Sequence, residues 1–398
     1  MLNSLKPMPP DPLLGVTEAF RADPSRDKVD LGVGVYRDAS GITPIPRAVR
    51  AAEQKMLARQ NTKAYVGPGG NRQFAAAMEK IALGASHPVL RDGRVATLPS
   101  VGGTGALRLA AELIRLGGTS AAVQVSDPTW ANHVPVMKGA GLETAAYPYY
   151  DIAGGRVLAA QMLEHLAGCA PGTVVLLHGS CHNPTGADPD PGHWAELADL
   201  MARRQLLPLV DMAYQGLGRG LDADAAGLRL LCERLPEVLV AVSCSKNFGL
   251  YRERVGAVMC VAESAATAAI TMGHLQSLAR RNYSMPPDHG EAIVAEIASD
   301  PALYADWQKE LDDMRDRVNG LRRSLATALR TELGSGRFDF IEQQSGMFSM
   351  LGLSKAAVER LRTEHHVYTA PDSRLNVAGL SGKEIPGVAR AIAAVSRD

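Results

Sequence analysis

The stretch Leu207–Lys246, LPLVDMAYQGLGRGLDADAAGLRLLCERLPEVLVAVSCSK, indicates the fold class of this chain. Two short apolar runs, Leu207–Asp211 and Val238–Ser243, lie on either side of an amphipathic stretch that includes Leu228–Leu235. Short apolar strands separated by a helix are typical of parallel strands with a covering helix. The same alternation continues on both sides, at Ala121–Val125, Thr173–Leu177, Pro191–Arg204 and Gly256–Val261. We therefore predict an α/β fold with a mostly parallel sheet sandwiched by helices.

The chain changes character after Pro301, where a long charged helical pattern runs from Tyr304 to Leu333. Two short apolar runs beyond it, Met347–Leu351 and Leu375–Val377, predict strands of a smaller α+β unit. We expect the segment before residue 44 to return to this unit. The expected organisation is an N-terminal arm over residues 1–13, a large domain over 44–313, and a small domain over 14–43 and 314–398.

The composition is that of an ordinary globular protein, with 46% hydrophobic and 21% charged residues among 398. Lys+Arg and Asp+Glu are 42 each, so no net charge favours nucleic acid or an anionic membrane. The five cysteines contain no CxxC pair, which argues against a disulfide framework. Met1–Pro12 lacks the pattern of a signal peptide, and no apolar run approaches the ~18 residues that span a bilayer. We expect a cytoplasmic protein with no nucleic-acid or membrane partner.

Lys246 is the one lysine between Lys138 and Lys309, and it directly follows the predicted strand Val238–Ser243. A solitary amine at the end of a buried strand suits covalent chemistry with a carbonyl group better than solvation at the surface. Burial and nearby positive charge lower the pKa of an amine, which is the condition for nucleophilic attack near neutral pH.

Other polar groups also follow predicted strands, among them Asp127, the run His178–Gly186, and Asp211. Ligands of open α/β sheets bind beyond the carboxyl ends of the strands. Asp211 and Tyr214 together offer a carboxylate and a phenol to a ring nitrogen and a ring oxygen of a bound heterocycle. The alternative interpretation is a helix-capping aspartate beside a packing tyrosine.

The run Val101–Ala106, VGGTGA, leads into the helical pattern Leu107–Leu116. Glycines before a helix allow backbone N–H groups to approach an anion, and the helix N-terminus favours phosphate. The run is not GxGxxG, and no acidic partner for a ribose is evident. An ordinary glycine-rich turn is the alternative.

The run His178–Gly186, HGSCHNPTG, offers His178, Cys181 and His182 as metal ligands. A zinc site requires a fourth ligand or an open catalytic position, and no second cluster with ligand spacing exists in the sequence. We therefore predict no metal, and we expect the rigid Asn-Pro-Thr-Gly turn to present Asn183 as a hydrogen-bond donor.

Ser243 and Lys246 also fit the Ser-x-x-Lys signature of serine acyl-enzymes. Such enzymes need companion Ser-Asp-Asn and Lys-Thr-Gly elements, and the chain has only Ser126-Asp127-Pro128 and no Lys-Thr-Gly.

Arg254, Arg280 and Arg374 complete the candidates, because guanidinium groups bind carboxylate and phosphate with two hydrogen bonds. The alternative for each arginine is an ordinary ion pair.

Together these motifs resemble the class I aminotransferases of the pyridoxal-phosphate fold-type I superfamily, in the branch of aspartate and aromatic amino acid aminotransferases. The similarity runs from Asp11–Gly15, DPLLG, and Leu31–Tyr36, LGVGVY, to Asn376–Gly379, NVAG. It implies a mostly parallel seven-stranded sheet and pyridoxal 5'-phosphate as cofactor. It also implies a homodimer with active sites at the subunit interface.

The resemblance assigns a role to each candidate residue. Lys246 matches the lysine that binds the cofactor covalently and carries the proton during catalysis, and Asp211 matches the carboxylate paired with the ring nitrogen. The residues that match the remaining cofactor contacts are Asn183 and Tyr214 at the ring oxygen, Trp130 stacked on the ring, His133 behind the aspartate, Gly103, Thr104, Ser243, Ser245 and Arg254 at the phosphate, and Tyr65 from the neighbouring subunit.

For the substrate, Arg374 matches the arginine that binds the α-carboxylate, with Asn183 and Gly34 beside it. Arg280 matches the arginine that reaches across the dimer interface to the distal carboxylate of a dicarboxylic substrate. Trp130 also borders the substrate. Ser180 stands where relatives often carry cysteine and Met285 lies in a variable loop position, but neither change removes a catalytic group.

The resemblance implies ping-pong transamination with 2-oxoglutarate or oxaloacetate as amino acceptor. Arg280 favours aspartate and glutamate as substrates. The runs Arg281–Ser284 and Ala85–Leu90 resemble bacterial members that accept aromatic amino acids. We predict an enzyme for tyrosine and phenylalanine that also uses aspartate and glutamate. A dedicated aspartate aminotransferase is the alternative, and a serine acyl-enzyme hydrolase is a remote one.

Overall fold

A seven-stranded sheet forms the centre of the computed structural model, which describes residues 2–7, 12–119 and 121–396. In spatial order the strands are β2 (Val95–Val101), β10 (Val255–Val261), β9 (Val238–Ser243), β8 (Leu207–Met212), β7 (Val174–His178), β3 (Val123–Asp127) and β4 (Thr144–Pro148). β10 is antiparallel to both of its neighbours, and the other pairings are parallel. The predicted mostly parallel seven-stranded sheet is confirmed.

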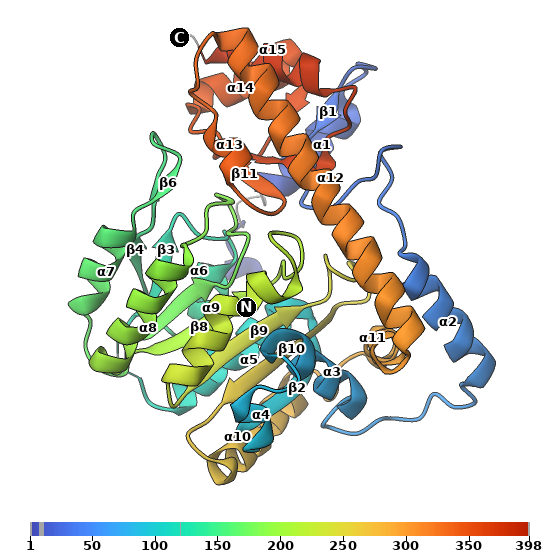
Figure 1. Cartoon of the computed structure of the whole chain (residues 1–398), viewed down its shortest axis with the longest axis vertical. Coiled ribbons are helices and arrows are strands. Elements are labelled where there is room, and N and C mark those ends of the chain that lie inside the picture. The colour runs from blue at the N-terminus through green and yellow to red at the C-terminus, as the bar shows by residue number, and fades with distance from the viewer. Residues whose placement is uncertain (1, 8–11, 120, 397–398) are drawn as a thin grey trace.

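Helices cover both faces of the sheet (Figure 1). One face packs against α5 (Gly102–Leu116), α6 (His133–Gly139) and α10 (Ala265–Asn282). The other face packs with α2 (Arg47–Arg59), α3 (Arg72–Leu83), α4 (Pro88–Arg91), α7 (Ala159–Ala167), α8 (Pro191–Arg204), α9 (Leu221–Arg234), α11 (Asp288–Ser299) and α12 (Pro301–Leu333). In β7, Val174 and Leu176 join the first core and Val175 and Leu177 the second. Strands buried on both faces therefore read as continuous apolar runs.

The five strands predicted for the centre of the chain are present, with ends shifted by at most two residues. β2 and β4, the two edge strands of the sheet, are not among the strands predicted from the sequence. Each contains a proline, Pro99 or Pro148, and β4 is only partly buried. Proline is tolerated at sheet edges because a backbone donor is dispensable there, and this hides edge strands from a pattern search.

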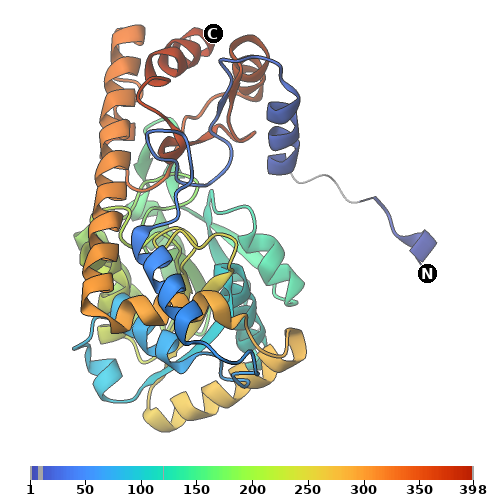
Figure 2. The same ribbon diagram turned by 90° about the vertical axis from the view of Figure 1, so that its right-hand side faces the viewer.

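Local capping explains where the two clearest helices begin. α8 matches its predicted bounds, and the Asp190 side chain accepts a hydrogen bond from His193 N (2.9 Å). In α12, the Asp300 carboxylate accepts from Ala302 N (2.9 Å), and the helix ends at Gly334, whose φ is +66°. Figure 2 shows α12 running along one side of the molecule, and its N-terminal part contacts α2.

A third apolar core lies at the other end of α12. It is built on the C-terminal half of that helix and on residues in and around β1 (Val29–Asp30), α13 (Phe340–Gln343), β11 (Phe348–Met350), α14 (Lys355–His365), β12 (Val367–Tyr368), β13 (Arg374–Asn376), η2 (Val377–Gly379) and α15 (Ile385–Val395). β1 pairs in parallel with β12, so the chain near residue 30 lies beside the chain near residue 367. The predicted strands at 347–351 and 375–377 correspond to β11 and β13, which pair with each other.

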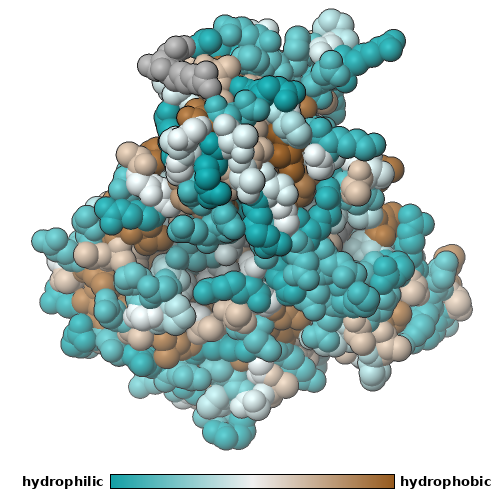
Figure 3. All heavy atoms as spheres, turned by 45° about the horizontal axis from the view of Figure 1, so that its top comes forward, coloured by the Kyte–Doolittle hydropathy of each residue, from teal (hydrophilic) through white to brown (hydrophobic). Residues whose placement is uncertain are grey.

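The remaining elements are peripheral. η1 (Leu2–Ser4) and α1 (Pro12–Ala22) begin the chain, and Figure 2 shows η1 away from the rest of the protein. Residues 1 and 8–11 of the expected N-terminal arm lie outside the described residues. A short hairpin joins β5 (Tyr150–Asp151) to β6 (Arg156–Val157). Within the described ranges, no helix combines the length and the apolar character needed to cross a membrane. Figure 3 shows hydrophilic residues over most of the face in view.

Candidate active site

A cavity of 160 Å³ opens beyond the carboxyl ends of β7, β8 and β9. Of the predicted site residues, ten line it: Gly103, Thr104, Trp130, Asn183, Asp211, Tyr214, Ser243, Ser245, Lys246 and Arg254. These residues come from six separate segments of the chain. The parallel strands bring them together because their carboxyl ends share one edge of the sheet.

Asp211 lies on the floor of the cavity and is held from behind by His133. His133 Nε2 lies 3.1 Å from Asp211 Oδ2, and His133 Nδ1 lies 2.8 Å from Thr129 Oγ1. Since an ionised carboxylate only accepts hydrogen bonds, Nε2 of His133 carries a proton. Burial by itself would raise the pKa of Asp211, but the hydrogen bond and positive charge from His133 hold that pKa below its usual value. The cavity floor therefore carries a fixed negative charge.

His178 lies next to Asp211, because the register of β7 and β8 pairs these two residues. Its ring is buried, both ring nitrogens lack a hydrogen-bond partner, and burial lowers the pKa of His178 to about 3. His178, His133 and Asp211 place ligand atoms within 4.8 Å of one another, although His133 and Asp211 already bond to each other. The neutral imidazole of His178 thus adds a polar group to the cavity floor.

The three candidate metal ligands named from the sequence, His178, Cys181 and His182, do not converge on one point. Both ring nitrogens of His182 lie at hydrogen-bond distance from hydroxyls, those of Ser126 (3.0 Å) and Thr185 (2.9 Å). The His182 ring also stacks on Tyr149 at 4.1 Å. His182 is therefore engaged in packing and hydrogen bonds beneath the Asn-Pro-Thr-Gly turn.

Lys246 projects into the cavity from the turn after β9. Its amine lies 4.9 Å from the centre of the Tyr214 ring. Loss of hydration lowers the pKa of Lys246 to about 8. The positive charges of Arg254 and Arg374 also lower this pKa, whereas the negative charge of Asp211 raises it. A substantial fraction of this amine is therefore neutral, and nucleophilic, close to neutral pH.

One end of the cavity is built to hold an anion. Gly103 and Thr104 lie in the first turn of α5, where unpaired N–H groups and the helix dipole favour negative charge. Arg254 lies beside them, and its Nη1 donates to Ser245 Oγ (3.4 Å). Gly102 has a φ of +64°, and a Cβ there would lie 2.6 Å from Arg254 Nη2. Only glycine at this position leaves room for the guanidinium.

The Ser243 hydroxyl belongs to this anion-binding end of the cavity. Its Oγ accepts a hydrogen bond from Ser245 N (3.3 Å), and a Cβ on Gly103 would lie 3.1 Å from Ser243 Cβ. The hydroxyl is thus directed by its own turn and faces the glycine-rich loop. This geometry favours a phosphate contact over the acyl-enzyme alternative.

Arg374 forms the opposite side of the site. Its Nη1 donates to Asn183 Oδ1 (3.1 Å), its Nη2 donates to Gly32 O (3.0 Å), and its buried Nε has no partner. Asn183 Nδ2 donates in turn to Tyr214 Oη (3.3 Å). Burial lowers the pKa of Arg374, and the unpaired Nε–H leaves a donor for a ligand carboxylate.

Phe348 supports Arg374 and was not identified from the sequence. The Arg374 guanidinium lies 4.4 Å from the centre of the Phe348 ring, and that ring meets Tyr214 edge-on at 6.0 Å. A Cβ on Gly34 would lie 2.8 Å from Phe348 Cζ, so glycine is required for this contact. The sequence predicted only a strand here, because a phenylalanine in an apolar run gives no sign of which residue it contacts. Leu107 and Ala213 also line the cavity, and no sequence motif indicated that they would.

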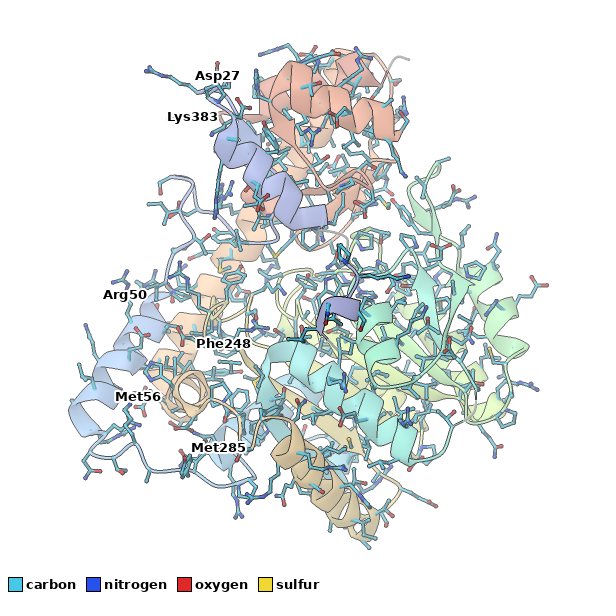
Figure 4. All side chains as sticks on the ribbon, turned by 180° about the vertical axis from the view of Figure 1, so that it is seen from behind. Asp27, Arg50, Met56, Phe248, Met285 and Lys383 are labelled. Carbon is cyan, nitrogen blue, oxygen red and sulfur yellow. The ribbon has the colours of Figure 1, made fainter. Side chains whose placement is uncertain are left out.

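Tyr65 and Arg280 are the predicted site residues that lie away from this cavity. The Tyr65 side chain is 91% exposed, and Arg280 is exposed near the end of α10. Figure 4 shows Met285 in the loop that follows α10, before α11 begins. Tyr65 and Arg280 therefore lie where they contribute nothing to the site of their own chain.

Comparison with known proteins agrees with the geometry of the site. A family model described as aminotransferase class I and II matches residues 26–392. The aromatic-amino-acid aminotransferase of Paracoccus denitrificans is 48% identical over 392 residues, which cover 98% of this chain and 99% of that protein. The aspartate aminotransferase of Haemophilus influenzae is 42% identical over 385 residues, which cover 97% of each protein.

A solved structure gives the same result for the fold. The crystal structure of an aromatic-amino-acid aminotransferase from Burkholderia pseudomallei, covalently bound to pyridoxal phosphate, matches with a TM-score of 0.97 and 42% identity. The match covers 99% of both chains. The chain therefore belongs to the aminotransferase class I and II family, whose enzymes use pyridoxal phosphate as their cofactor.

Proposed function

We propose that this aminotransferase acts on aromatic amino acids, tyrosine and phenylalanine, and also on aspartate and glutamate. The amino acceptor is 2-oxoglutarate or oxaloacetate, and the first 2-oxo acid leaves before the acceptor binds at the same site. The observation that carries the proposal is the placement of one buried amine, Lys246, between the carboxylate of Asp211 and the guanidinium of Arg374, whose Nε–H is unpaired.

The residues present fit pyridoxal phosphate at both ends. Arg254, Ser243, Ser245 and the first turn of α5 would hold its phosphate, and Asp211 would pair with its ring nitrogen. Asn183 and Tyr214 would donate to its ring oxygen, and Trp130 would cover the ring. When bound, the cofactor supplies an aldehyde carbon and an electron-withdrawing ring.

The remaining chemistry belongs to the side chains. Lys246 Nζ would hold the cofactor covalently and, as a free amine, would take the proton from the substrate Cα. Arg374 and Asn183 bind the α-carboxylate and so keep it fixed while the proton is lost. Asp211, kept ionised by His133, stabilises positive charge at the ring nitrogen. Loss of the Cα proton would thus be favoured by two fixed charges, Arg374 at the substrate carboxylate and Asp211 at the ring nitrogen.

The same site is proposed to be completed by a second copy of the chain. Tyr65 would contact the phosphate of the partner, and Arg280 would contact the distal carboxylate of its substrate. Support comes from the exposure of both side chains outside the cavity of their own chain. Leu2 and Leu5, 73% and 72% exposed, give the N-terminal arm an apolar surface to place on a partner.

We propose the same domain boundaries and the same cellular location that the sequence predicts. We propose a large domain over 44–313 and a small domain over 14–43 and 314–398, supported by the separate third core. α12 passes through residue 313 without a break, so it would link the two domains mechanically. All five cysteines are free and buried, as expected for the cytoplasm.

Measurement of kcat/KM with tyrosine, phenylalanine and aspartate, each with 2-oxoglutarate, tests the substrate proposal. We expect turnover of all three. Turnover of aspartate alone would favour the dedicated aspartate aminotransferase, which the exposed Arg280 also fits. A colourless protein that takes up no pyridoxal phosphate and transfers no amino group would contradict the site assignment as a whole.

A further inference from the structure

Arg322, on α12, is fully buried and directs its guanidinium at one short segment of the chain. Its three nitrogens donate to four backbone carbonyls and one hydroxyl. The acceptors are Gly346 O (3.0 Å from Nε, 2.7 Å from Nη2), Ile341 O (3.0 Å), Ser345 O (3.2 Å), Phe348 O (2.5 Å) and Ser349 Oγ (2.7 Å). Within the described part of the chain, no carboxylate forms an ion pair with Arg322.

Burial of a guanidinium without a carboxylate is costly, and the pKa of Arg322 is lowered to about 10 by loss of hydration. The compensation comes from charge-assisted hydrogen bonds, which need the planar fork of arginine to reach carbonyls in several directions. The strand in this segment, β11, pairs with β13 over only three residues, so most of the segment lies outside a ladder. The guanidinium therefore fixes the path of residues 341–349.

The segment fixed by Arg322 contacts the turn that carries Asn183. Ser345 N donates to Gly186 O (2.8 Å), and a Cβ on Gly186 would lie 2.2 Å from Phe348 O and 3.1 Å from Arg322 Nη2. Gly346 packs as tightly, because a Cβ there would lie 2.3 Å from Cys181 Cβ. Movement of residues 345–348 would therefore displace the turn that holds Asn183.

The same segment carries the support of Arg374. β11 pairs with β13 so that Met350 lies opposite Arg374, and the Phe348 ring lies 4.4 Å from the guanidinium. Asn183 and Phe348, which both contact Arg374, are thus positioned through one buried group on α12. We propose that Arg322 is a positioning residue that sets the geometry of the carboxylate-binding group formed by Arg374, Asn183 and Phe348. The inference rests on the proposed role of Arg374 in binding the substrate α-carboxylate.

The test compares Arg322→Lys and Arg322→Met with Arg323→Met, the neighbouring exposed arginine on α12. Each variant is assayed with phenylalanine and with 2-phenylethylamine, which lacks the carboxylate, in single-turnover half-reactions followed by the cofactor absorbance. We expect Arg322→Met to lower kcat/KM for phenylalanine by about 100-fold, and Arg322→Lys by about 10-fold. The reaction of the amine should change by less than about 3-fold, because the amine has no carboxylate for Arg374 to bind. The affinity for pyridoxal phosphate should change as little, because its phosphate would be held at the opposite end of the site.

A purely structural role would lower both reactions alike, together with cofactor affinity, and would overturn the proposal. Unchanged kcat/KM for phenylalanine in the Arg322 variants would overturn it as well. Ser349→Ala removes a single acceptor of Arg322 and should fold in any case, with a smaller loss confined to phenylalanine. Failure of the proposed function is distinguishable, because the unsubstituted protein itself would then transfer no amino group.

Discussion

His133 Nε2 lies 3.1 Å from Asp211 Oδ2, with His133 fully buried and Asp211 only 6% exposed. A carboxylate in such a place loses its hydration, which by itself raises its pKa. The hydrogen bond and charge of His133 outweigh this effect, so the pKa of Asp211 lies below its usual value. Asp211 is therefore ionised throughout the neutral range and is oriented by a partner that bonds onward to Thr129.

Asp211→Asn should reduce the transition-state stabilisation derived from kcat/KM by about 3 kcal/mol. The reason is that the amide carries no negative charge to balance the ring nitrogen. His133→Asn should cost less, since it acts through Asp211. The double variant should lose no more activity than Asp211→Asn alone, as kinetics of all three would show. Additive losses would mean that His133 has a separate role. Asp222→Asn, at an exposed position, is the matched control.

Lys246→Ala should reduce turnover by at least about 10⁴-fold, because we propose that this one amine is both the covalent anchor and the proton carrier. The variant should still bind pyridoxal phosphate through the anion-binding end of the site, but borohydride should not fix the cofactor to it. Absorbance spectra and mass spectrometry after reduction check this. Lys309→Ala removes an exposed lysine and should behave like the unsubstituted protein. An active Lys246→Ala enzyme would refute the assignment.

The rate at which the cofactor-free protein captures pyridoxal phosphate should rise with pH and level off above about 8, where Lys246 loses its proton. The sign follows from the reaction, because only the neutral amine attacks an aldehyde. Asp211 raises the pKa of Lys246, so Asp211→Asn should shift the midpoint to lower pH. Stopped-flow absorbance measures both profiles. A rate that still climbs steeply above pH 9 would indicate an amine with an ordinary pKa.

Mixing Lys246→Ala subunits with Arg280→Ala subunits should restore aspartate turnover if Arg280 acts across a dimer interface. In the hybrid dimer, one site combines an intact Lys246 with an Arg280 from the partner. Each variant alone should be poor with aspartate, whereas Arg280→Ala should retain most of its activity with phenylalanine. No recovery in mixtures that demonstrably exchange subunits would place Arg280 elsewhere.

Glu291→Gln should stabilise the protein at alkaline pH. Glu291 is fully buried, its Oε2 accepts from Asn71 N (3.2 Å), its Oε1 has no partner, and burial raises its pKa to about 8. The folded state therefore binds more protons than the unfolded state between pH 4.5 and 8, and stability falls as pH rises through this window. The glutamine side chain does not titrate, so the variant should not lose stability over this pH window.

Thermal unfolding of Glu291→Gln and of the unsubstituted protein at pH 5.5 and pH 8.5 checks this prediction. The Tm difference should favour the variant and be larger at pH 8.5. Glu237→Gln, at an exposed position, is the control and should show no such dependence. Equal Tm differences at the two pH values would mean that Glu291 titrates normally.

Local sequence predicted most of the site because its polar groups lie at the carboxyl ends of strands or a few residues beyond them. Asp211, Lys246 and Asn183 could be located from an apolar run and the polar residue behind it. Parallel topology then required them to share one edge of the sheet. Edge strands β2 and β4 escaped prediction since each contains a proline, and the partial exposure of β4 also breaks the apolar pattern.

Arg322 and Phe348 show what no local pattern contained. Arg322 lies in a charged helical stretch beside Arg323, and the two look alike in the sequence, yet one is fully buried and the other exposed. The sequence by itself determined the five central strands, the helices between them and the polar groups at the strand ends, because hydrophobic periodicity is a local property. The tertiary structure alone decided which guanidinium is buried and which ring supports Arg374. Those outcomes depend on contacts between residues far apart in the chain, which no short-range spacing encodes.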